Sequence, residues 1–346
     1  MEEVLVSWVD NKMSNCCDWE GVQCNTTTRR VIKLSLYHTR QFNPDGFSSI
    51  FSDRLPTLNL SLFHPFEELK SLNLSYNYFK GWHENEAYDG FRYLKQLKIL
   101  DLNDNWFNAS LLSYLNNLNS LTTLNLRWNN MGEGLKSAKQ GLANLKNLKV
   151  LDLGYNEIYG SLSSLGLANL TNLKVLNLGG NQINNSLSSL GLKMLRNLEE
   201  LDLSDNGMGG SLTLLRLANL TNLKVLNLRW NQINSSLSSL GLANLTNLKS
   251  LDLSGNQINT SLSSLGLKYL KNLEQLNMRY NGMSGSLTSL GLANLINLKS
   301  LDLSDNQINT SLASLGLQNL KNLEELNMRY NGISGSLTSL GLVNLT

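Results

Sequence analysis

A short pattern of leucines, L-x-L-x-x-N, recurs along most of the chain. In the instance from Leu176 to Asn181, two leucines alternate with polar residues and an asparagine follows. This alternation predicts a short strand in each repeat, with the leucines turned toward a core. From Asn156 onward the interval between these asparagines is a constant 25 residues. The asparagines, here called the ladder asparagines, are Asn77, Asn105, Asn129, Asn156, Asn181, Asn206, Asn231, Asn256, Asn281, Asn306 and Asn331.

A fixed period of this length predicts a leucine-rich-repeat solenoid. In such a fold each repeat contacts only its neighbours, so one elongated domain can hold 346 residues. We therefore expect an α/β repeat solenoid: a curved leucine-rich-repeat horseshoe with a parallel β-sheet on the concave face and an N-terminal disulfide cap. The capping segment is expected at residues 1–30. The repeats follow at 31–346, irregular over 31–141 and regular over 142–346.

The ladder asparagines are assigned a structural role. An asparagine side chain carries both a donor and an acceptor, so when it turns inward it can pair backbone groups of its own and neighbouring turns. A leucine at this position would leave those groups unpaired. We therefore expect the ladder asparagines to belong to the scaffold.

The two residues before each ladder asparagine are the candidates for ligand binding. Side chains between the inward leucines point to the concave face, because a strand alternates with period two. From repeat to repeat the pair alternates between Arg-aromatic and small or acidic, so the true unit is about 50 residues, two repeats of the solenoid. With strands about 4.8 Å apart, one column would carry an arginine about every 10 Å. The candidates are Arg127, Trp128, Tyr155, Arg229, Trp230, Arg279, Tyr280, Arg329 and Tyr330.

Two interpretations of the arginines remain open. Arginine and aromatic residues are common binding hot spots, and arginine can hold a carboxylate, sulfate or phosphate with two hydrogen bonds. Alternatively, each arginine stacks on a neighbouring aromatic ring or pairs with Asp205 or Asp305, in a solvated pattern copied by duplication. The sequence does not decide between them.

Three cysteines lie within nine residues of one another: Cys16, Cys17 and Cys24. The clustering predicts a local staple, for which we favour a Cys17–Cys24 disulfide, and leaves Cys16 without a partner in the chain. A zinc site is the alternative, but no histidine lies nearby and two of the thiols are adjacent, which suits tetrahedral coordination poorly.

The segment around these cysteines carries a family resemblance. It reads W…CC-x-W-x-G-V-x-C from Trp8 to Cys24, then R-V-I-K-L-S-L from Arg30 to Leu36, then leucine-rich repeats. This order resembles the ectodomain of plant leucine-rich-repeat receptor-like proteins, truncated at both ends. In that family the first cysteine of the adjacent pair bonds to a cysteine further upstream, in a segment that is missing here, as are the signal peptide and the transmembrane helix.

The resemblance implies an extracellular ligand-recognition module at the plasma membrane. Its ligand would be a peptide, protein or glycan on the concave face, and the whole receptor would signal through a co-receptor kinase in defence or development. A secreted leucine-rich-repeat inhibitor of microbial cell-wall-degrading enzymes is the rival, since it shares the cap and the repeat type. A cytoplasmic adaptor is the third option, which free thiols at Cys17 and Cys24 would favour.

N-glycosylation sequons bear on which surface is free. Most of them lie outside the strand pattern, so glycans there would coat the flank and back and leave the concave face open. Asn73 is the exception within a strand. The candidate acceptors are Asn25, Asn108, Asn169, Asn184, Asn219, Asn234, Asn244, Asn259 and Asn309.

Composition argues against several other functions. A net charge of +2, with 16% charged residues, provides no broad basic surface for nucleic acid. His38, His64 and His83 are scattered, and no glycine-rich phosphate loop or catalytic constellation is present, so we expect neither an enzyme nor a cofactor. The loop with His83, Glu84, Glu86 and Asp89 is interpreted as a solvated connection rather than a metal site.

Overall fold

The computed structural model describes most of the chain and divides it into two compact units. The described residues are 14–39, 55–82, 91, 93–132, 135, 141–159, 165–183, 191–209, 217–234, 241–258, 267–284, 291–310 and 317–334. Unit 1 comprises Met1–Ile158 and Leu162–Leu173, and unit 2 comprises Tyr159–Ser161 and Lys174–Thr346. Two of the expected glycosylation sites, Asn184 and Asn259, and the acidic loop at 83–90 lie outside the described residues.

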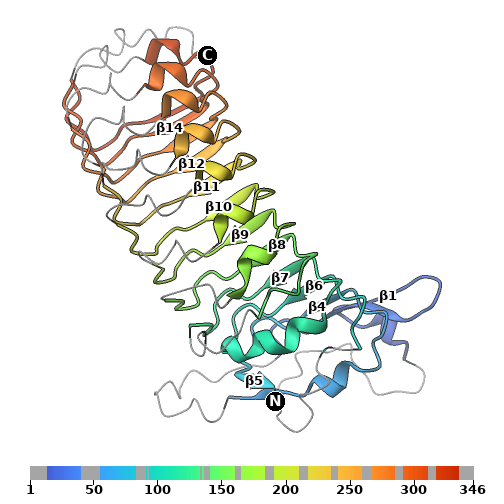
Figure 1. Cartoon of the computed structure of the whole chain (residues 1–346). Coiled ribbons are helices and arrows are strands. Elements are labelled where there is room, and N and C mark those ends of the chain that lie inside the picture. Colours follow the sequence, from blue (N-terminus) through green and yellow to red (C-terminus); the bar gives the residue numbers. More distant parts are fainter. Residues whose placement is uncertain are drawn as a thin grey trace. The chain divides into compact units, whose positions relative to one another are not determined.

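Unit 1 contains a mainly parallel sheet whose strands follow the order β1-β2-β4-β6-β7-β8 (Figure 1). Strand β1 runs antiparallel to β2, and every later pairing is parallel. A two-stranded parallel sheet, β3-β5, accompanies it. The strands are β1 (Val22–Cys24), β2 (Val31–Ser35), β3 (Thr57–Leu58), β4 (Ser71–Asn73), β5 (Gly81–Trp82), β6 (Ile99–Asp101), β7 (Thr123–Asn125) and β8 (Val150–Asp152). The helices are η1 (Cys16–Asp18), η4 (Leu60–Phe63), η6 (Ala109–Asn117) and η9 (Leu167–Asn169).

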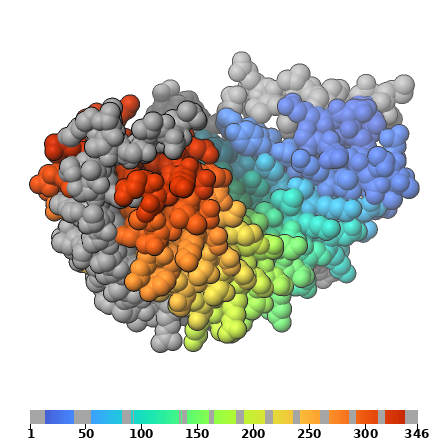
Figure 2. Space-filling model, turned by 90° about the horizontal axis from the view of Figure 1, so that it is seen from above, coloured from blue at the N-terminus to red at the C-terminus, as the bar shows by residue number. Residues whose placement is uncertain are grey.

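Unit 2 repeats one motif of strand, turn and short helix. Its strands pair in parallel and in sequence order, and its helices stack in a column beside them (Figure 1). The strands are β9 (Val175–Asn177), β10 (Glu200–Asp202), β11 (Val225–Asn227), β12 (Ser250–Asp252), β13 (Gln275–Asn277), β14 (Ser300–Asp302) and β15 (Glu325–Asn327). The helices are η11 (Leu192–Met194), η13 (Leu217–Asn219), η15 (Leu242–Asn244), η17 (Leu267–Tyr269), η19 (Leu292–Asn294) and η21 (Leu317–Asn319). Figure 2 shows the surface of these repeats following one another in chain order, toward red.

The leucines of the pattern form the core of each unit. In β11 the central Leu226 is buried and pairs in register with Leu251 of β12, so leucine lies beside leucine along the sheet. Leu228, which follows the strand, is also fully buried. The expected repeat solenoid with a parallel sheet is therefore confirmed, and it follows from the period-two pattern of each strand.

The helices of the described residues are all 3-10 helices, each three residues long in unit 2, and no α-helix is among them. A glycine with positive φ precedes several of these turns, as at Gly241 (φ 70°) before Leu242. A Cβ at Gly241 would lie 2.7 Å from the Cβ of Ala218 in the preceding repeat, so the close stacking of turns needs glycine here. A segment of only three residues is a natural 3-10 helix, since longer runs have poor hydrogen-bond geometry. Among the described residues, no helix has the length and apolar character needed to cross a membrane.

Candidate ligand-binding face

The ladder asparagines lie inside the solenoid and hold consecutive repeats together. Asn231 is 6% exposed, and its Nδ2 donates to the carbonyl oxygens of Leu203, Leu228 and Arg229 at 3.0 to 3.2 Å. Its Oδ1 accepts from the backbone N–H of Met208 at 3.0 Å. One side chain therefore pairs backbone groups of two repeats, and the same pattern recurs at Asn256, Asn281 and Asn306.

A second series of asparagines, which the sequence analysis missed, links the repeats on the other side of the strand. Asn247, four residues before the strand-centre leucine Leu251, donates from Nδ2 to the carbonyl oxygen of Thr221 at 2.8 Å. The signal was available, because an N-L pair recurs at this position in every regular repeat. The series is Asn147, Asn172, Asn222, Asn247, Asn272, Asn297 and Asn322.

The exposed side of the strands, here called the sheet face, carries a row in which Asn and Asp alternate as the last residue of successive strands. Asp202 Oδ1 accepts from the backbone N–H of Ser204 at 2.8 Å, while its Oδ2 accepts from Asn227 Nδ2 at 3.1 Å. Asp252 and Asp302 repeat the arrangement with the asparagines of the next strands. An Asp on every strand would place like charges about 4.8 Å apart, which destabilises a sheet. The alternation of Asn and Asp between successive repeats therefore has a structural cause.

A row of lysines and glutamates runs along the start of the unit 2 strands. Glu199 lies between Lys174 and Lys224, with N–O distances of 2.7 and 2.6 Å. Hydrogen bonds from Lys174 and then Lys224 lower the pKa of the Glu199 carboxyl from 4.5 to about 2. Glu274 lies in the same way between Lys249 and Lys299, and the same kind of contact lowers its pKa.

Acid should weaken unit 2 through Glu199. Because the folded state lowers this pKa, the stabilisation is present above pH 4.5 and is lost as the pH falls toward about 2. We expect Glu199→Gln to flatten the stability profile over this window when denaturant unfolding is measured at several pH values. Glu200→Gln is the control, since Glu200 makes no ion pair among the described residues. Identical profiles for the two variants would contradict the role of the ion pairs.

The candidate ligand-binding pairs lie beyond the strands rather than within them, which corrects the expected position. Strand β11 ends at Asn227, so Arg229 and Trp230 belong to the turn that follows. The second residue of each pair has a left-handed backbone, whether it is glycine, aspartate or aromatic. The aromatic cases are Trp128 (φ 54°), Tyr155 (φ 54°), Trp230 (φ 51°), Tyr280 (φ 58°) and Tyr330 (φ 57°).

In unit 1 the pairs form a stacked aromatic surface. The rings of Trp128 and Tyr155 stack with centroids 4.3 Å apart and an interplanar angle of 12°. The Arg127 Cζ lies 4.6 Å from the centroid of the Tyr155 ring. Trp128 is 50% exposed, so this unit 1 platform is available at the surface.

In unit 2 the aromatic residues reach across one repeat. Trp230 and Tyr280 lie 5.7 Å apart at 45°, and Trp230 covers Gly255 of the intervening repeat. A Cβ at Gly255 would lie 2.6 Å from the Trp230 ring, so only glycine admits this contact. The indole of Trp230 and the phenol of Tyr280 stay about half exposed and form the unit 2 platform.

The arginines are not equivalent members of one column. Arg279 Nε lies 2.8 Å from Asp305 Oδ2, and Arg229 Cζ lies 5.8 Å from the Trp230 centroid. Arg127, Arg229 and Arg279 thus each have an internal partner of the kind that the second interpretation described. Arg329 and Tyr330 are both exposed, with Tyr330 at 78%. Ring contacts, rather than the arginines, define each platform: Trp128 with Tyr155 in unit 1, and Trp230 with Tyr280 in unit 2.

Five of the described candidate acceptors are exposed outside the strands. Asn169, Asn219 and Asn244 are the last residues of 3-10 helices and are exposed, away from the strands. Asn234 and Asn309 are exposed in the turns after the strands. Two others have structural bonds: Asn108 caps η6 by accepting from Ser110 N–H, and Asn25 accepts from Thr27 N–H and donates to Glu68.

The expected disulfide between Cys17 and Cys24 is confirmed. Cys16 has a free thiol, and the three sulfur atoms lie within 4.8 Å of one another. Because two of these sulfurs are bonded to each other, the cluster does not offer the thiolate ligands that a zinc site requires.

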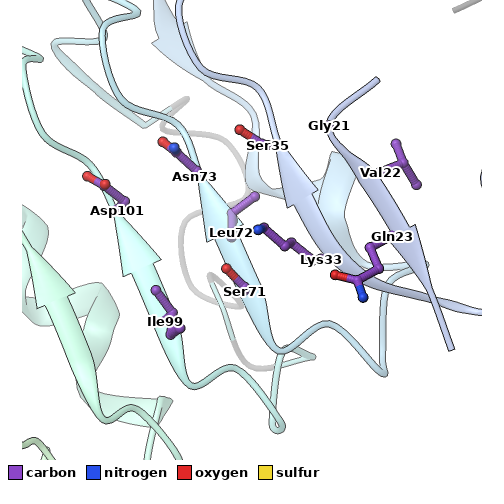
Figure 3. Close-up of a pocket in the computed structure, with 10 residues that line it drawn as sticks. All are labelled: Gly21, Val22, Gln23, Lys33, Ser35, Ser71, Leu72, Asn73, Ile99 and Asp101. Carbon is purple, nitrogen blue, oxygen red and sulfur yellow. The ribbon is translucent and has the colours of Figure 1, made fainter. Parts of the chain in front are cut away.

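Near the N-terminal end of unit 1 the sheet face is hollowed. The hollow has a volume of about 580 Å³. Its lining residues come from β1, β2, β4, β6 and the turn before β1: Gly21, Val22, Gln23, Lys33, Ser35, Ser71, Leu72, Asn73, Ile99 and Asp101 (Figure 3). It was not among the sites expected from the sequence.

Comparisons with known proteins agree with this fold. The family described as "Leucine rich repeat N-terminal domain" matches residues 2–25. The family "Leucine Rich repeat" matches residues 117–135, 169–186, 195–211, 219–236, 244–261, 294–311 and 319–336. Among solved structures, a TDR receptor has 29% identity and a TM-score of 0.61, covering 80% of this chain and 46% of that one. The crystal structure of PEPR1-AtPEP1 has 25% identity and a TM-score of 0.57, covering 96% and 46%.

Relatives by sequence come from plants. Receptor like protein 21 of Arabidopsis thaliana is 42% identical over 169 residues, which is 48% of this chain and 16% of that protein. The matched stretch thus spans about a sixth of the relative's length. The resemblance found in the sequence is confirmed: the chain is a leucine-rich-repeat protein whose relatives are the plant receptor-like proteins.

Proposed function

We propose that the chain is the extracellular ligand-recognition module of a plant cell-surface receptor-like protein. Its ligand, a peptide or protein, binds the sheet face at the unit 1 and unit 2 platforms. Tryptophan, tyrosine and arginine are the residues that most often dominate such contacts. All three types meet at each platform.

The observation that carries the proposal is the backbone of the aromatic residues. A left-handed conformation suits glycine and aspartate, and Gly180, Asp205, Gly255 and Asp305 occupy the equivalent positions. A bulky residue there costs about 1 to 3 kcal/mol. Strain of this kind is concentrated at ligand-binding sites, where the surrounding structure holds it in place. The aromatic rings are therefore explained better by recognition than by folding.

Three features support an extracellular location. A disulfide joins Cys17 to Cys24, and disulfides persist in oxidising compartments. The sequons Asn169, Asn219 and Asn244 are exposed on the helix side of the repeats, away from the platforms. The relatives are receptor-like proteins by name. A membrane anchor, a co-receptor kinase and a role in defence or development are carried over from the family. A secreted inhibitor of cell-wall-degrading enzymes would use the same face, and the coding sequence downstream distinguishes the two.

Removing three arginines tests the ligand face. We expect Arg229→Ala, Arg279→Ala and Arg329→Ala together to lower ligand affinity at least about tenfold, because hydrogen bonds to charged groups contribute about 1.5 to 3 kcal/mol each. The ligand is obtained by capturing peptides from plant extracellular fluid on the immobilised chain, and its affinity for each variant is then measured by calorimetry.

A matched control removes the same charge elsewhere. Lys193→Ala, Lys271→Ala and Lys321→Ala take three exposed cations from the helix side of unit 2. We expect this variant to bind as the unchanged chain does. Equal affinity of the arginine variant and the control would refute the assignment of the ligand to this face.

A further inference from the structure

The hollow on the unit 1 sheet face is built by the register of its strands. Lys33, Ser71 and Ile99 lie opposite one another across β2, β4 and β6, and Ser35, Asn73 and Asp101 form a second row (Figure 3). Ser71 is the small member of the first row, so the surface dips between Lys33 and Ile99. Figure 3 shows Lys33 extending from β2 toward β4, over this dip.

The antiparallel strand β1 supplies the rim. The backbone N–H of Ser35 donates to the Gly21 carbonyl oxygen at 2.7 Å, which brings the two segments together. Gly21 has φ 75°, and a Cβ there would collide with the Ser35 carbonyl oxygen. Glycine is thus required for the rim to cross so close to β2. Val22 and Gln23 follow it along the edge of the hollow.

Apart from Asp101, each polar side chain of the hollow has a hydrogen-bond donor. Lys33 makes no ion pair with any described residue, and Ser35, Ser71 and the amides of Asn73 and Gln23 lie around it. The Asn73 Oδ1 already accepts from Ser75 N–H and Oγ at 2.9 and 2.6 Å, so its amide nitrogen remains to donate.

Asp101 is the one acidic residue of the lining, and its oxygens are already engaged. Oδ1 accepts from the backbone N–H of Asn103 at 3.0 Å, and the carboxyl also has a side-chain hydrogen bond with Asn125. Burial raises the pKa of this carboxyl. Asp101 therefore closes one side of the hollow without neutralising Lys33.

We propose that the hollow binds a carboxylate, namely the acidic side chain of a peptide ligand. The carboxylate oxygens accept from Lys33 and from the hydroxyls of Ser35 and Ser71, and the aliphatic part of the same side chain packs on Ile99, which is 43% exposed. The assignment to a peptide rests on the proposed function, whereas the anion site does not. Within unit 1 the site is separate from the platform of that unit, because the hollow lies at the strands and the platform lies beyond strand ends.

Protection of Lys33 from acetylation tests the site without knowledge of the natural ligand. The probe is the capped tripeptide acetyl-Ala-Glu-Ala-amide, and its glutamine counterpart is the neutral comparison. With a Kd of about 1 mM, about 10 mM glutamate probe should slow Lys33 modification about tenfold. The glutamine probe should protect far less. Peptide mapping of the full chain reports every lysine, and exposed Lys70 and Lys98 should keep their rates.

A pair of variants tests whether protection of Lys33 depends on the hollow rather than on any leucine added to the sheet face. Ser71→Leu fills the dip and should abolish protection of Lys33. Thr123→Leu places the same side chain two strands away in the same row and should leave it intact. Equal protection by both probes, or none by the glutamate probe, overturns the proposal. Better protection by galacturonic acid than by the tripeptide overturns the peptide assignment.

Glycosylation of Asn73 is a further test, since Asn73-Leu74-Ser75 is a sequon. A glycan on Asn73 would occupy the hollow. Peptide mapping of the protein from its native source should find Asn73 unmodified, and a modified Asn73 overturns the proposal. None of these outcomes depends on the platforms, so the proposed function can fail while the anion site stands, or the reverse.

Discussion

Replacing Asn231 by leucine should destabilise unit 2 by about 4 kcal/mol. Its Nδ2 donates to carbonyl oxygens of two repeats, and its Oδ1 accepts from the backbone N–H groups of Met208 and Asn206. All of these groups lose their partner at once, and each buried unpaired group costs about 1 to 3 kcal/mol. The added apolar contact of leucine offsets only part of this. Hydrogen exchange across unit 2 measures the effect, since repeats can open separately.

The control for this prediction is Asn222→Leu. Asn222 is exposed and makes one hydrogen bond, to the carbonyl oxygen of Arg196. Water can replace that bond, so we expect a loss of no more than about 1 kcal/mol. If both variants lowered protection to the same extent, the ladder asparagines would not be the dominant link between repeats.

The scaffold could be predicted from the sequence because its causes are local and repeated. Leu226 and Leu228 belong to one strand pattern, and Asn231 lies five and three residues after them. The role of each residue follows from its type: leucine is buried, and a buried asparagine must pair its amide. The cysteine spacing likewise restricted the disulfide to a short loop. Because the repeats share one sequence pattern, the roles predicted for leucine and asparagine in one repeat apply to the others.

The site could be predicted only in part, because its geometry depends on contacts between repeats. The Arg-aromatic pairs were identified by composition, but the left-handed turn at Trp230 follows from how the chain leaves the strand. Arg279 forms an ion pair with Asp305, which belongs to the next repeat, so its partner does not follow from its own repeat. The alternation of Asn and Asp was visible, yet its meaning appears only when Asn227 is placed beside Asp202. The hollow requires the antiparallel pairing of β1, for which the repeat pattern holds no signal.

Substituting glycine for both Trp230 and Tyr280 should separate binding from folding. Both residues have left-handed backbones, so glycine relieves about 1 to 3 kcal/mol of strain at each. Glycine also adds about 0.5 to 1 kcal/mol of backbone entropy cost per residue, and the contact between the rings, about 0.5 to 1.5 kcal/mol, is lost. The relieved strain, about 2 to 6 kcal/mol over the two positions, offsets most or all of these costs of about 1.5 to 3.5 kcal/mol, so we expect the free energy of unfolding to fall by no more than about 1 kcal/mol. Ligand affinity should fall about a hundredfold or more, as for two truncated hot-spot residues.

Asp205→Gly is the matched control, because Asp205 has the same left-handed conformation (φ 51°) in the same unit but carries no ring. Because aspartate tolerates this conformation, the substitution should change the free energy of unfolding little, and it should leave affinity unchanged. Calorimetry with the captured ligand and denaturant unfolding of the same preparations give both quantities. A double glycine variant that unfolds several kcal/mol more easily would mean that the rings serve the fold, and that the strain at Trp230 and Tyr280 is not held for recognition. Retained affinity would place the ligand elsewhere on the molecule.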